Sequence, residues 1–242
     1  MDVAYWDTMS EAFDEEIFNS LKQDVRGVIR GAIESVSSQR KAVMDLGCGV
    51  GRYLPLLSTL FGKVHAADWS PGCVRRAAAV AQRLPNVDVA LPRSYRGPAW
   101  SGRFGVVTAI NVVFDPLARR RDALLKEIRR LLARRGSLVL AVPSLEAVVY
   151  ADAVRRTYAP RRPSLYGFAG SASKNDPGIL TLEGIPYKHW VGEELLLSLR
   201  GAGFKPGPLV RVDYRWETEV IAPPRPRELA PPWDWLVVAR RA

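Results

Sequence analysis

An apolar segment that runs directly into a glycine-rich turn constrains this chain more than any other feature. Residues 43–46 read Val-Met-Asp-Leu, and Gly47, Gly49 and Gly51 follow before a helical pattern begins. Glycine tolerates positive φ and lets a ligand approach the backbone closely, and the helix that follows offers unpaired N–H groups. A second apolar segment ends at Asp68, where an acid can accept hydrogen bonds from both hydroxyls of a ribose. The pattern predicts a nucleoside-binding site.

The spacing of the glycines separates the candidate ligands. A dinucleotide fingerprint reads G-x-G-x-x-G and a P-loop requires Gly-Lys-Ser/Thr, whereas this turn reads G-x-G-x-G with Asp45 two residues before it. A carboxylate at that position repels a pyrophosphate and attracts a ligand that carries an ammonium or sulfonium group. The residues therefore favour S-adenosylmethionine (SAM) over NAD.

Both segments resemble motifs of a known family. Residues 45–51 (Asp-Leu-Gly-Cys-Gly-Val-Gly) resemble motif I of the class I SAM-dependent methyltransferases, and residues 67–71 (Ala-Asp-Trp-Ser-Pro) resemble their acidic second motif. Over residues 40–144 and 188–242 the chain is similar to the family. The resemblance implies a Rossmann-like fold, SAM as the methyl donor and S-adenosylhomocysteine (SAH) as the product.

The resemblance also implies roles for individual residues. Asp45 would orient the amino group of the cofactor, Asp68 would hold the ribose, Trp69 would lie against the adenine, and Asn111 would face the methionine part or the methyl group. The plainer alternatives are that Asp45 caps the turn, that Trp69 packs in the core and that Asn111 only serves a turn. The expected cofactor residues are Asp45, Gly47, Cys48, Gly49, Gly51, Asp68, Trp69, Ser94, Asn111 and Phe13.

Two positions depart from the family pattern. The family usually places an acid after the third strand, to bind the adenine amino group, but residues 91–94 read Leu-Pro-Arg-Ser here. Ser94 or the backbone is the expected substitute. The family's acid at the start of the fourth strand is replaced by Gly105.

Alternation of strand and helix patterns predicts an α/β fold with a doubly wound, mostly parallel seven-stranded sheet and helices on both faces. In the family the last strand is antiparallel. We expect helices over 9–37 (mostly helical, with Phe13, Ile17, Leu21, Val25 and Val28 on one side), 51–60, 71–83, 145–158 and 191–202. We expect strands at 42–46, 63–68, 87–91, 105–110, 137–142, 208–216 and 233–239.

The domain organisation follows from these elements. Residues 1–242 are expected to form a single SAM-binding domain with two additions. Residues 1–38 would be an N-terminal helical lid. Residues 145–190, which include a hairpin at 179–187, would be a lid or substrate wall. The alternative for the second addition is a surface excursion without a role in the site.

Methyl transfer depends mainly on alignment and exclusion of water, and it needs a base only when the nucleophile starts protonated. Of the two histidines, His65 lies inside a strand and is expected to be structural. His189 and Asn111 are the catalytic candidates, and the alternative for His189 is that it caps the helix after it. The expected substrate-binding residues are Tyr5, Tyr150, Tyr187, His189 and Trp190. Cys48 and Cys73 fit no zinc spacing, so no metal is expected.

The formal net charge is +10, and much of the excess lies in arginines between residues 119 and 135. Leucines recur at helical spacing in that segment, so we expect the leucines to face the sheet and the arginines to face solvent. A nucleic-acid footprint is the second interpretation, but no aromatic residues interleave with these arginines. The sequence therefore does not favour a nucleic-acid partner.

Absent motifs narrow the substrate. Residues 111–114 read Asn-Val-Val-Phe, not Asn/Asp-Pro-Pro-Tyr, which argues against exocyclic amines of DNA or of protein glutamine. We expect a small-molecule O-, N- or C-methyltransferase. The alternatives are an RNA or protein methyltransferase that uses an arginine-rich face, and a SAM-fold binding or scaffold protein that transfers no methyl group. No membrane span or signal peptide is evident, so we expect a cytoplasmic protein. The acceptor and the oligomeric state stay open.

Overall fold

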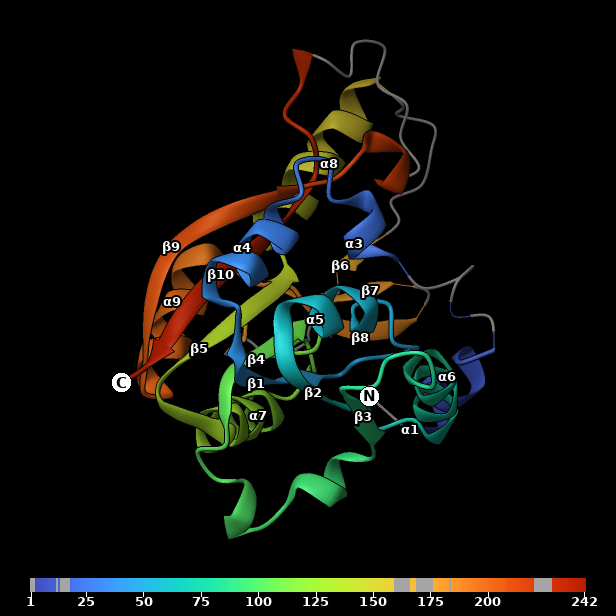
Figure 1. The fold of residues 1–242 in the computed structure, drawn as a ribbon. Helices are drawn as coiled ribbons and strands as arrows, with labels where there is room; N and C mark the ends of the chain where they lie inside the picture. The colour runs from blue at the N-terminus through green and yellow to red at the C-terminus, as the bar shows by residue number, and fades with distance from the viewer. Residues whose placement is uncertain are drawn as a thin grey trace.

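A seven-stranded sheet in the order β3-β2-β1-β4-β5-β10-β9 forms the centre of the molecule (Figure 1). The computed structural model describes residues 3–11, 13, 18–158, 166–168, 176–182, 184–219 and 228–242. The strands are β1 (Ser38–Leu46), β2 (Phe61–Ala67), β3 (Val87–Ala90), β4 (Phe104–Ile110), β5 (Leu132–Pro143), β9 (Phe204–Asp213) and β10 (Trp233–Arg241). β1 to β5 are parallel and β10 is antiparallel to both of its neighbours, which confirms the predicted sheet.

Helices cover both faces of this sheet. One face packs against α4 (Val28–Val36), α5 (Leu54–Leu60) and α6 (Pro71–Ala81), and the other packs against α7 (Ala118–Leu131) and α9 (Gly192–Gly201). Because both faces are covered, the central strands are near-continuous apolar runs without polar alternation. Short 3-10 turns are η1 (Pro92–Tyr95), η2 (Pro98–Trp100) and η3 (Trp216–Glu219).

The strand order reverses between β1 and β4. The chain leaves β1 toward β2 and β3 on one side, then returns to place β4 and β5 on the other. Parallel sheets bind ligands in the crevice that such a reversal opens at the carboxyl ends of the strands. The ends of β1, β2 and β4 at Leu46, Ala67 and Ile110 therefore mark the expected site.

The predicted helix over residues 9–37 is interrupted within the described part of the N-terminal region. The described residues there include helices α1 (Val3–Met9), α3 (Ser20–Gln23) and α4, and Ile17 lies outside the described residues. Gly27 adopts a left-handed φ of 65°, and the carboxylate of Asp24 accepts a hydrogen bond from the Ile29 amide at 2.7 Å. These features separate α3 from α4, because a left-handed residue interrupts a right-handed helix. Val25, expected on the apolar side, is 58% exposed between them.

The second addition contains the predicted helix, α8 (Leu145–Tyr158), which stands at the top of the molecule in Figure 1. A small antiparallel sheet of β6 (Tyr166–Phe168), β7 (Ile179–Leu182) and β8 (Ile185–Lys188) follows. β7 and β8 form the predicted hairpin, although Glu183 in its turn lies outside the described residues. Among the described helices, none is long and apolar enough to span a membrane.

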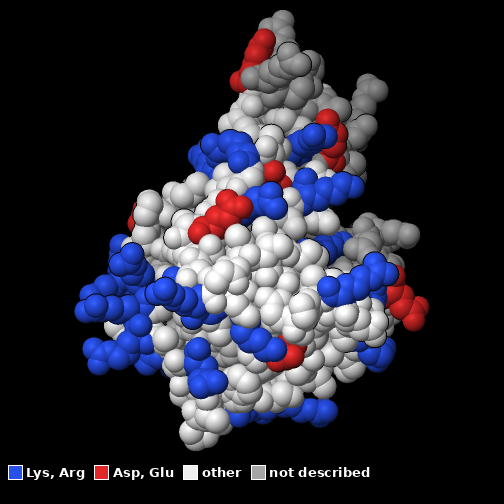
Figure 2. Space-filling model, viewed as in Figure 1, with Lys and Arg blue, Asp and Glu red and all other residues white. Residues whose placement is uncertain are grey.

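Basic side chains gather at one corner of the molecule. Figure 2 shows lysines and arginines concentrated at the corner where Figure 1 places the C-terminus. At this edge Arg240 of β10 pairs with Lys205 of β9, and Arg134 and Arg135 are exposed near the amino end of β5. The expectation that the α7 arginines face solvent is wrong for Arg121, which is buried.

Candidate functional site

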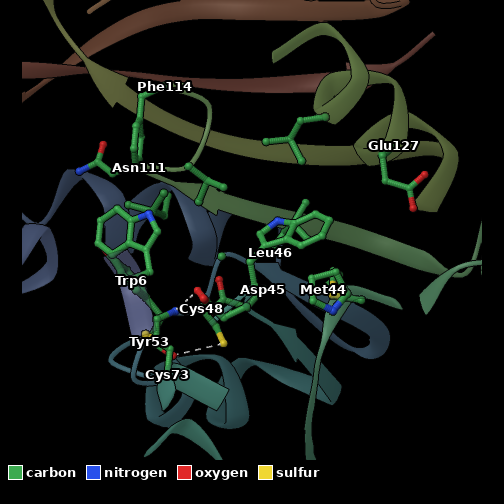
Figure 3. Close-up of a pocket in the computed structure, with 18 of the residues that line it drawn as sticks. Trp6, Met44, Asp45, Leu46, Cys48, Tyr53, Cys73, Asn111, Phe114 and Glu127 are labelled. Carbon is green, nitrogen blue, oxygen red and sulfur yellow. Dashed lines mark hydrogen bonds between the residues drawn. The ribbon is translucent and has the colours of Figure 1, made fainter. Parts of the chain in front are cut away.

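A cavity of about 1140 Å³ follows the crevice at the carboxyl ends of β1, β2 and β4. Its wall combines the N-terminal segment, the glycine turn, the loop after β4 and part of α7. Figure 3 shows Trp6, Asn111 and Phe114 grouped at one end, with Met44 and Glu127 at the other. The volume suits a cofactor together with a small second ligand.

The glycine turn forms part of the floor. Gly47, Gly49 and Gly51 have φ values of 74°, 52° and 88°, which favour glycine. Gly47 and Gly49 line the cavity, and a side chain at Gly49 would come within 2.7 Å of the Phe13 ring. Gly51 does not line it; a Cβ there would lie 3.2 Å from the Ala77 backbone, so this glycine lets α6 pack closely.

Asp45 presents a buried carboxylate to the cavity at the end of β1. Thr108 Oγ1 donates a hydrogen bond to Asp45 Oδ1 at 2.7 Å, while Oδ2 has no partner among the described residues. Burial raises the pKa of Asp45 to about 6, against the lowering effect of the Thr108 hydrogen bond. A buried, unpaired carboxylate oxygen is costly alone and fits a ligand that supplies a cationic N–H donor.

Asp68 lies at the end of β2, and its carboxylate is hydrogen-bonded to the glycine turn. Its Oδ2 accepts from the Gly49 amide at 2.9 Å and its Oδ1 from the Ser70 amide at 3.0 Å. Burial raises the pKa of Asp68. Each carboxylate oxygen has a second lone pair, so both stay able to accept ligand hydroxyls. Trp69 and Cys48 line the cavity beside it, and Trp69 is 49% exposed.

Asn111 follows β4 in a left-handed conformation with φ of 53°, which asparagine tolerates better than most residues. Its Nδ2 donates to Asp234 Oδ2 at 3.3 Å, and Tyr214 donates to the same oxygen at 2.9 Å. Asn111 lines the cavity, and its Oδ1 is buried without a partner in the part of the chain that the structure describes.

The N-terminal segment is fastened over the glycine turn. Asp7 accepts hydrogen bonds from the Gly72 amide at 2.6 Å and from Ser70 Oγ at 3.1 Å, at the start of α6. The Arg52 guanidinium donates to the Phe13 carbonyl at 2.8 Å and lies 4.9 Å from the Phe13 ring centroid. These contacts bring Trp6 and Phe13 into the cavity wall.

Several predicted site residues do not line the cavity. Ser94 is exposed, and the neighbouring Tyr95 lines the cavity instead. His189 and Trp190 are buried; Trp190 Nε1 donates to the Val113 carbonyl at 2.7 Å. Burial lowers the pKa of His189 to about 4, so this side chain is neutral at pH 7.

The predicted tyrosines likewise lie outside the wall. The ring of Tyr5 packs against that of Trp6, with 5.3 Å between the ring centroids, and the ring of Tyr187 packs against that of Phe114, with 5.6 Å between the centroids. Trp6 and Phe114 line the cavity. Tyr150 packs against Trp233.

Sequence reasoning missed a pair of hydroxyls in the wall. Ser20 Oγ and Tyr53 Oη lie 2.9 Å apart and both line the cavity. Tyr53 lies two residues after Gly51, and this position was a usable signal. No sequence pattern marks Ser20, because its place depends on how the N-terminal segment packs.

Part of the chain matches the model of a known family. Residues 43–136 match the family described as "Methyltransferase domain", which spans β1 to the start of β5 and includes the glycine turn, Asp68 and Asn111. Comparison with curated protein sequences finds no match.

Many solved structures share the fold at low identity. The Burkholderia thailandensis 1,6-didemethyltoxoflavin-N1-methyltransferase, solved with 1,6-didemethyltoxoflavin and SAH, is 16% identical, with a TM-score of 0.65 over 99% of this chain and 87% of that one. The putative methyltransferase in complex with the Haloferax volcanii Trm112 activator is 16% identical, with a TM-score of 0.64 over 99% of this chain and 96% of that one. The [4+2]-cyclase SpnF is 17% identical, with a TM-score of 0.59 over 88% and 79%.

Proposed function

We propose that this chain, which belongs to the class I SAM-dependent methyltransferases, transfers a methyl group to an O, N or C nucleophile of a small molecule. The observation that carries the proposal is Asp45 Oδ2, which has no hydrogen-bond partner among the described residues and belongs to a side chain that lines the cavity above the glycine turn. Asp68 supplies carboxylate oxygens for a ribose at one end of this floor, one strand away from Asp45. When bound, the cofactor supplies an electrophilic methyl group on a sulfonium.

The chain's own residues would act by binding, orienting and excluding water. Asp45 would hold the ammonium group, Asp68 the ribose and Trp69 the adenine face. Trp6 and Phe13 come from an N-terminal segment that is fastened to the glycine turn and to α6, so they would shield the reacting centre from solvent. In this proposal residues 1–38 are the lid and residues 145–190 support the wall, with Tyr187 packed behind Phe114.

Catalysis by alignment is the mechanism that these residues favour. His189 is buried, neutral and outside the cavity wall, so its proposed part is limited to supporting the β7–β8 hairpin. Its backbone amide donates to the Gly178 carbonyl at 2.7 Å. Asn111 lines the cavity and is the better candidate for contact with the reacting groups.

The size of the cavity and the aromatic residues that line it favour a small methyl acceptor. Trp6 packs against Phe13 and Phe114, and these three apolar rings line one part of the cavity. The exposed arginines at the amino edge of the sheet lie at the opposite ends of the strands from the cavity. The Burkholderia methyltransferase of the same fold acts on a small heterocycle, which is consistent with such a cavity.

The test is a methyl-transfer assay that follows SAH release from SAM. The acceptors are small amines, phenols and N–H heterocycles, with RNA and unfolded protein in parallel. We expect turnover with at least one small acceptor and a shallow dependence on salt. Methylation of RNA with a steep salt dependence would contradict the small-molecule assignment. SAH binding without turnover of any acceptor would favour a protein of this fold that transfers no methyl group. SpnF, which shares the fold, is named as a [4+2]-cyclase.

A further inference from the structure

The polar groups of the cavity follow the order of the strands. Asp68 ends β2, Asp45 lies near the end of β1, and Asn111 follows β4. On the proposed function, the cofactor extends along these three strands with its ribose at β2. The methyl acceptor would then lie at the Asn111 end of the cavity, which Trp6 and Phe114 also line (Figure 3). Asp234, which is hydrogen-bonded to Asn111 and pairs with Pro143 at the carboxyl end of β5, does not line the cavity itself.

Asp234 fixes the orientation of the Asn111 amide. An ionised carboxylate only accepts hydrogen bonds, so the atom of Asn111 that lies 3.3 Å from Asp234 Oδ2 is the nitrogen. Asn111 Oδ1 must then point to the other side of the amide. That oxygen is buried and has no hydrogen-bond partner among the described residues, although its residue lines the cavity. Tyr214 donates to the same Asp234 oxygen at 2.9 Å and holds the carboxylate in place.

The backbone of Asn111 also restrains the position of its side chain. The left-handed φ of 53° at Asn111 lies where the chain turns sharply away from β4, and the Asn111 amide donates to the Ala141 carbonyl at 2.9 Å. The side chain therefore leaves a fixed backbone and meets a fixed carboxylate, which together set where Oδ1 presents its lone pairs.

The electrostatics at this end of the cavity disfavour an anion. Asp234 accepts a hydrogen bond from Asn111, and Asp45 lines the same cavity as Asn111. Burial raises the pKa of Asp234 to about 6, so it is largely ionised at pH 7.5. Four arginines line the wall: Arg52, Arg96, Arg120 and Arg130. The Arg52 guanidinium donates to the carbonyls of Phe13 and Phe18, Arg120 pairs with Asp115, and Arg130 pairs with Glu127. A phosphate or carboxylate on the acceptor would be repelled here, whereas an N–H or O–H donor meets an unused acceptor.

We propose that Asn111, oriented by Asp234, selects the methyl acceptor: a neutral or cationic group that donates an N–H or O–H hydrogen bond to Asn111 Oδ1. Asp234 is a positioning residue, because it acts through Asn111. The hydroxyl pair of Ser20 and Tyr53 lines the same cavity and offers a further hydrogen bond to the acceptor molecule. This inference rests on the proposed function and adds the chemical class of the substrate.

Two cofactor analogues test it without knowledge of the acceptor. SAH lacks the methyl group, and sinefungin carries a primary amine where the sulfonium methyl group stands. The sinefungin amine is a cationic N–H donor that projects toward the acceptor space. In wild type we expect sinefungin to bind more tightly than SAH by calorimetry at pH 7.5. Asp234→Asn offers an N–H to Asn111 Oδ1, so we expect it to weaken sinefungin at least about tenfold and SAH less than about twofold.

The matched control is Asp213→Asn, which removes a nearby carboxylate that pairs with Arg26 at 2.9 Å on the surface. It should leave the ratio of the two affinities unchanged. Thermal denaturation reports whether each variant is folded. Should Asp234→Asn fail to fold, Asn111→Gly deletes Oδ1 while keeping a residue that accepts positive φ, and the same selective loss is expected.

The outcomes are distinguishable. An unchanged ratio in a folded variant overturns the inference, and so does an equal loss of both ligands or the same loss in the control. Binding of neither ligand to folded wild type overturns the proposed function, and the inference with it.

Discussion

At the scale of single residues, the proposed function makes Asp45 the group whose protonation state would decide whether the cofactor binds. Its carboxylate is buried beside Thr108, with one oxygen unpaired in the described chain, and its pKa is raised to about 6. Only the ionised form attracts an ammonium group. The ligand and the proton therefore compete for the same carboxylate.

The affinity for SAH should fall with acid. Because the free carboxyl titrates at about pH 6, we expect SAH to bind about tenfold more weakly at pH 5 than at pH 7.5. Calorimetric titrations over this range measure the effect. Thr108→Val removes the hydrogen bond that lowers the pKa, so it should move the midpoint to higher pH. Asp45→Asn should bind weakly at every pH; a variant that kept the wild-type pH dependence would contradict the role of Asp45.

At the scale of secondary-structure elements, a buried ion network joins the second addition to the sheet domain. Lys188 at the end of β8 is fully buried, and its Nζ lies 2.9 Å from Asp176 Oδ1 and 2.5 Å from Glu194 Oε1 of α9. Arg121 of α7 pairs with the other oxygen of Asp176. Burial tends to raise the pKa of Asp176, but hydrogen bonds from Arg121 and Lys188 outweigh it and lower the pKa.

Removing one charged partner of this network should lower the free energy of unfolding more than removing an anion and a cation together. Asp176→Ala leaves two buried cations short of a partner, and we expect it to lower the free energy of unfolding by about 3 kcal/mol in urea denaturation. Adding Lys188→Met removes one of those cations and should recover part of the loss. The control is Glu34→Ala, whose exposed pair with Arg30 should be worth less than about 1 kcal/mol. Strictly additive losses from Asp176→Ala and Lys188→Met would contradict the network.

The same elements show where prediction from sequence stops. The glycine turn, Asp45 and Asp68 were predictable, because strand–turn–helix geometry places them within a few residues of each other. The burial of His189 was not predictable, because the neighbouring Trp190 holds this segment against the end of β5. The Trp190 amide donates to the Pro143 carbonyl at 2.8 Å, and the Leu145 amide donates to the Trp190 carbonyl at 3.0 Å. Hydrogen bonds between segments this far apart in the chain leave no periodicity to read.

At the scale of the whole molecule, the topology was predictable and the composition of the cavity wall only in part. Alternating apolar segments specify seven strands, and the family resemblance specifies the antiparallel last strand. The wall also takes Ser20 from a short N-terminal helix and Tyr95 from a turn after β3. Their positions follow from how the N-terminal segment and η1 pack onto the sheet, and neither segment carries a recognisable motif.

The most direct test of the account is a calorimetric titration of the folded protein with SAH, with Asp68→Ala and the surface variant Asp88→Ala in parallel. Asp68 lines the cavity, whereas Asp88 pairs with Lys63 at 2.8 Å on the outside of β3. We predict micromolar binding to wild type and to Asp88→Ala, and at least about tenfold weaker binding to Asp68→Ala. Absence of binding to a folded wild-type protein, or equal affinity in all three, would contradict a cofactor site in this cavity.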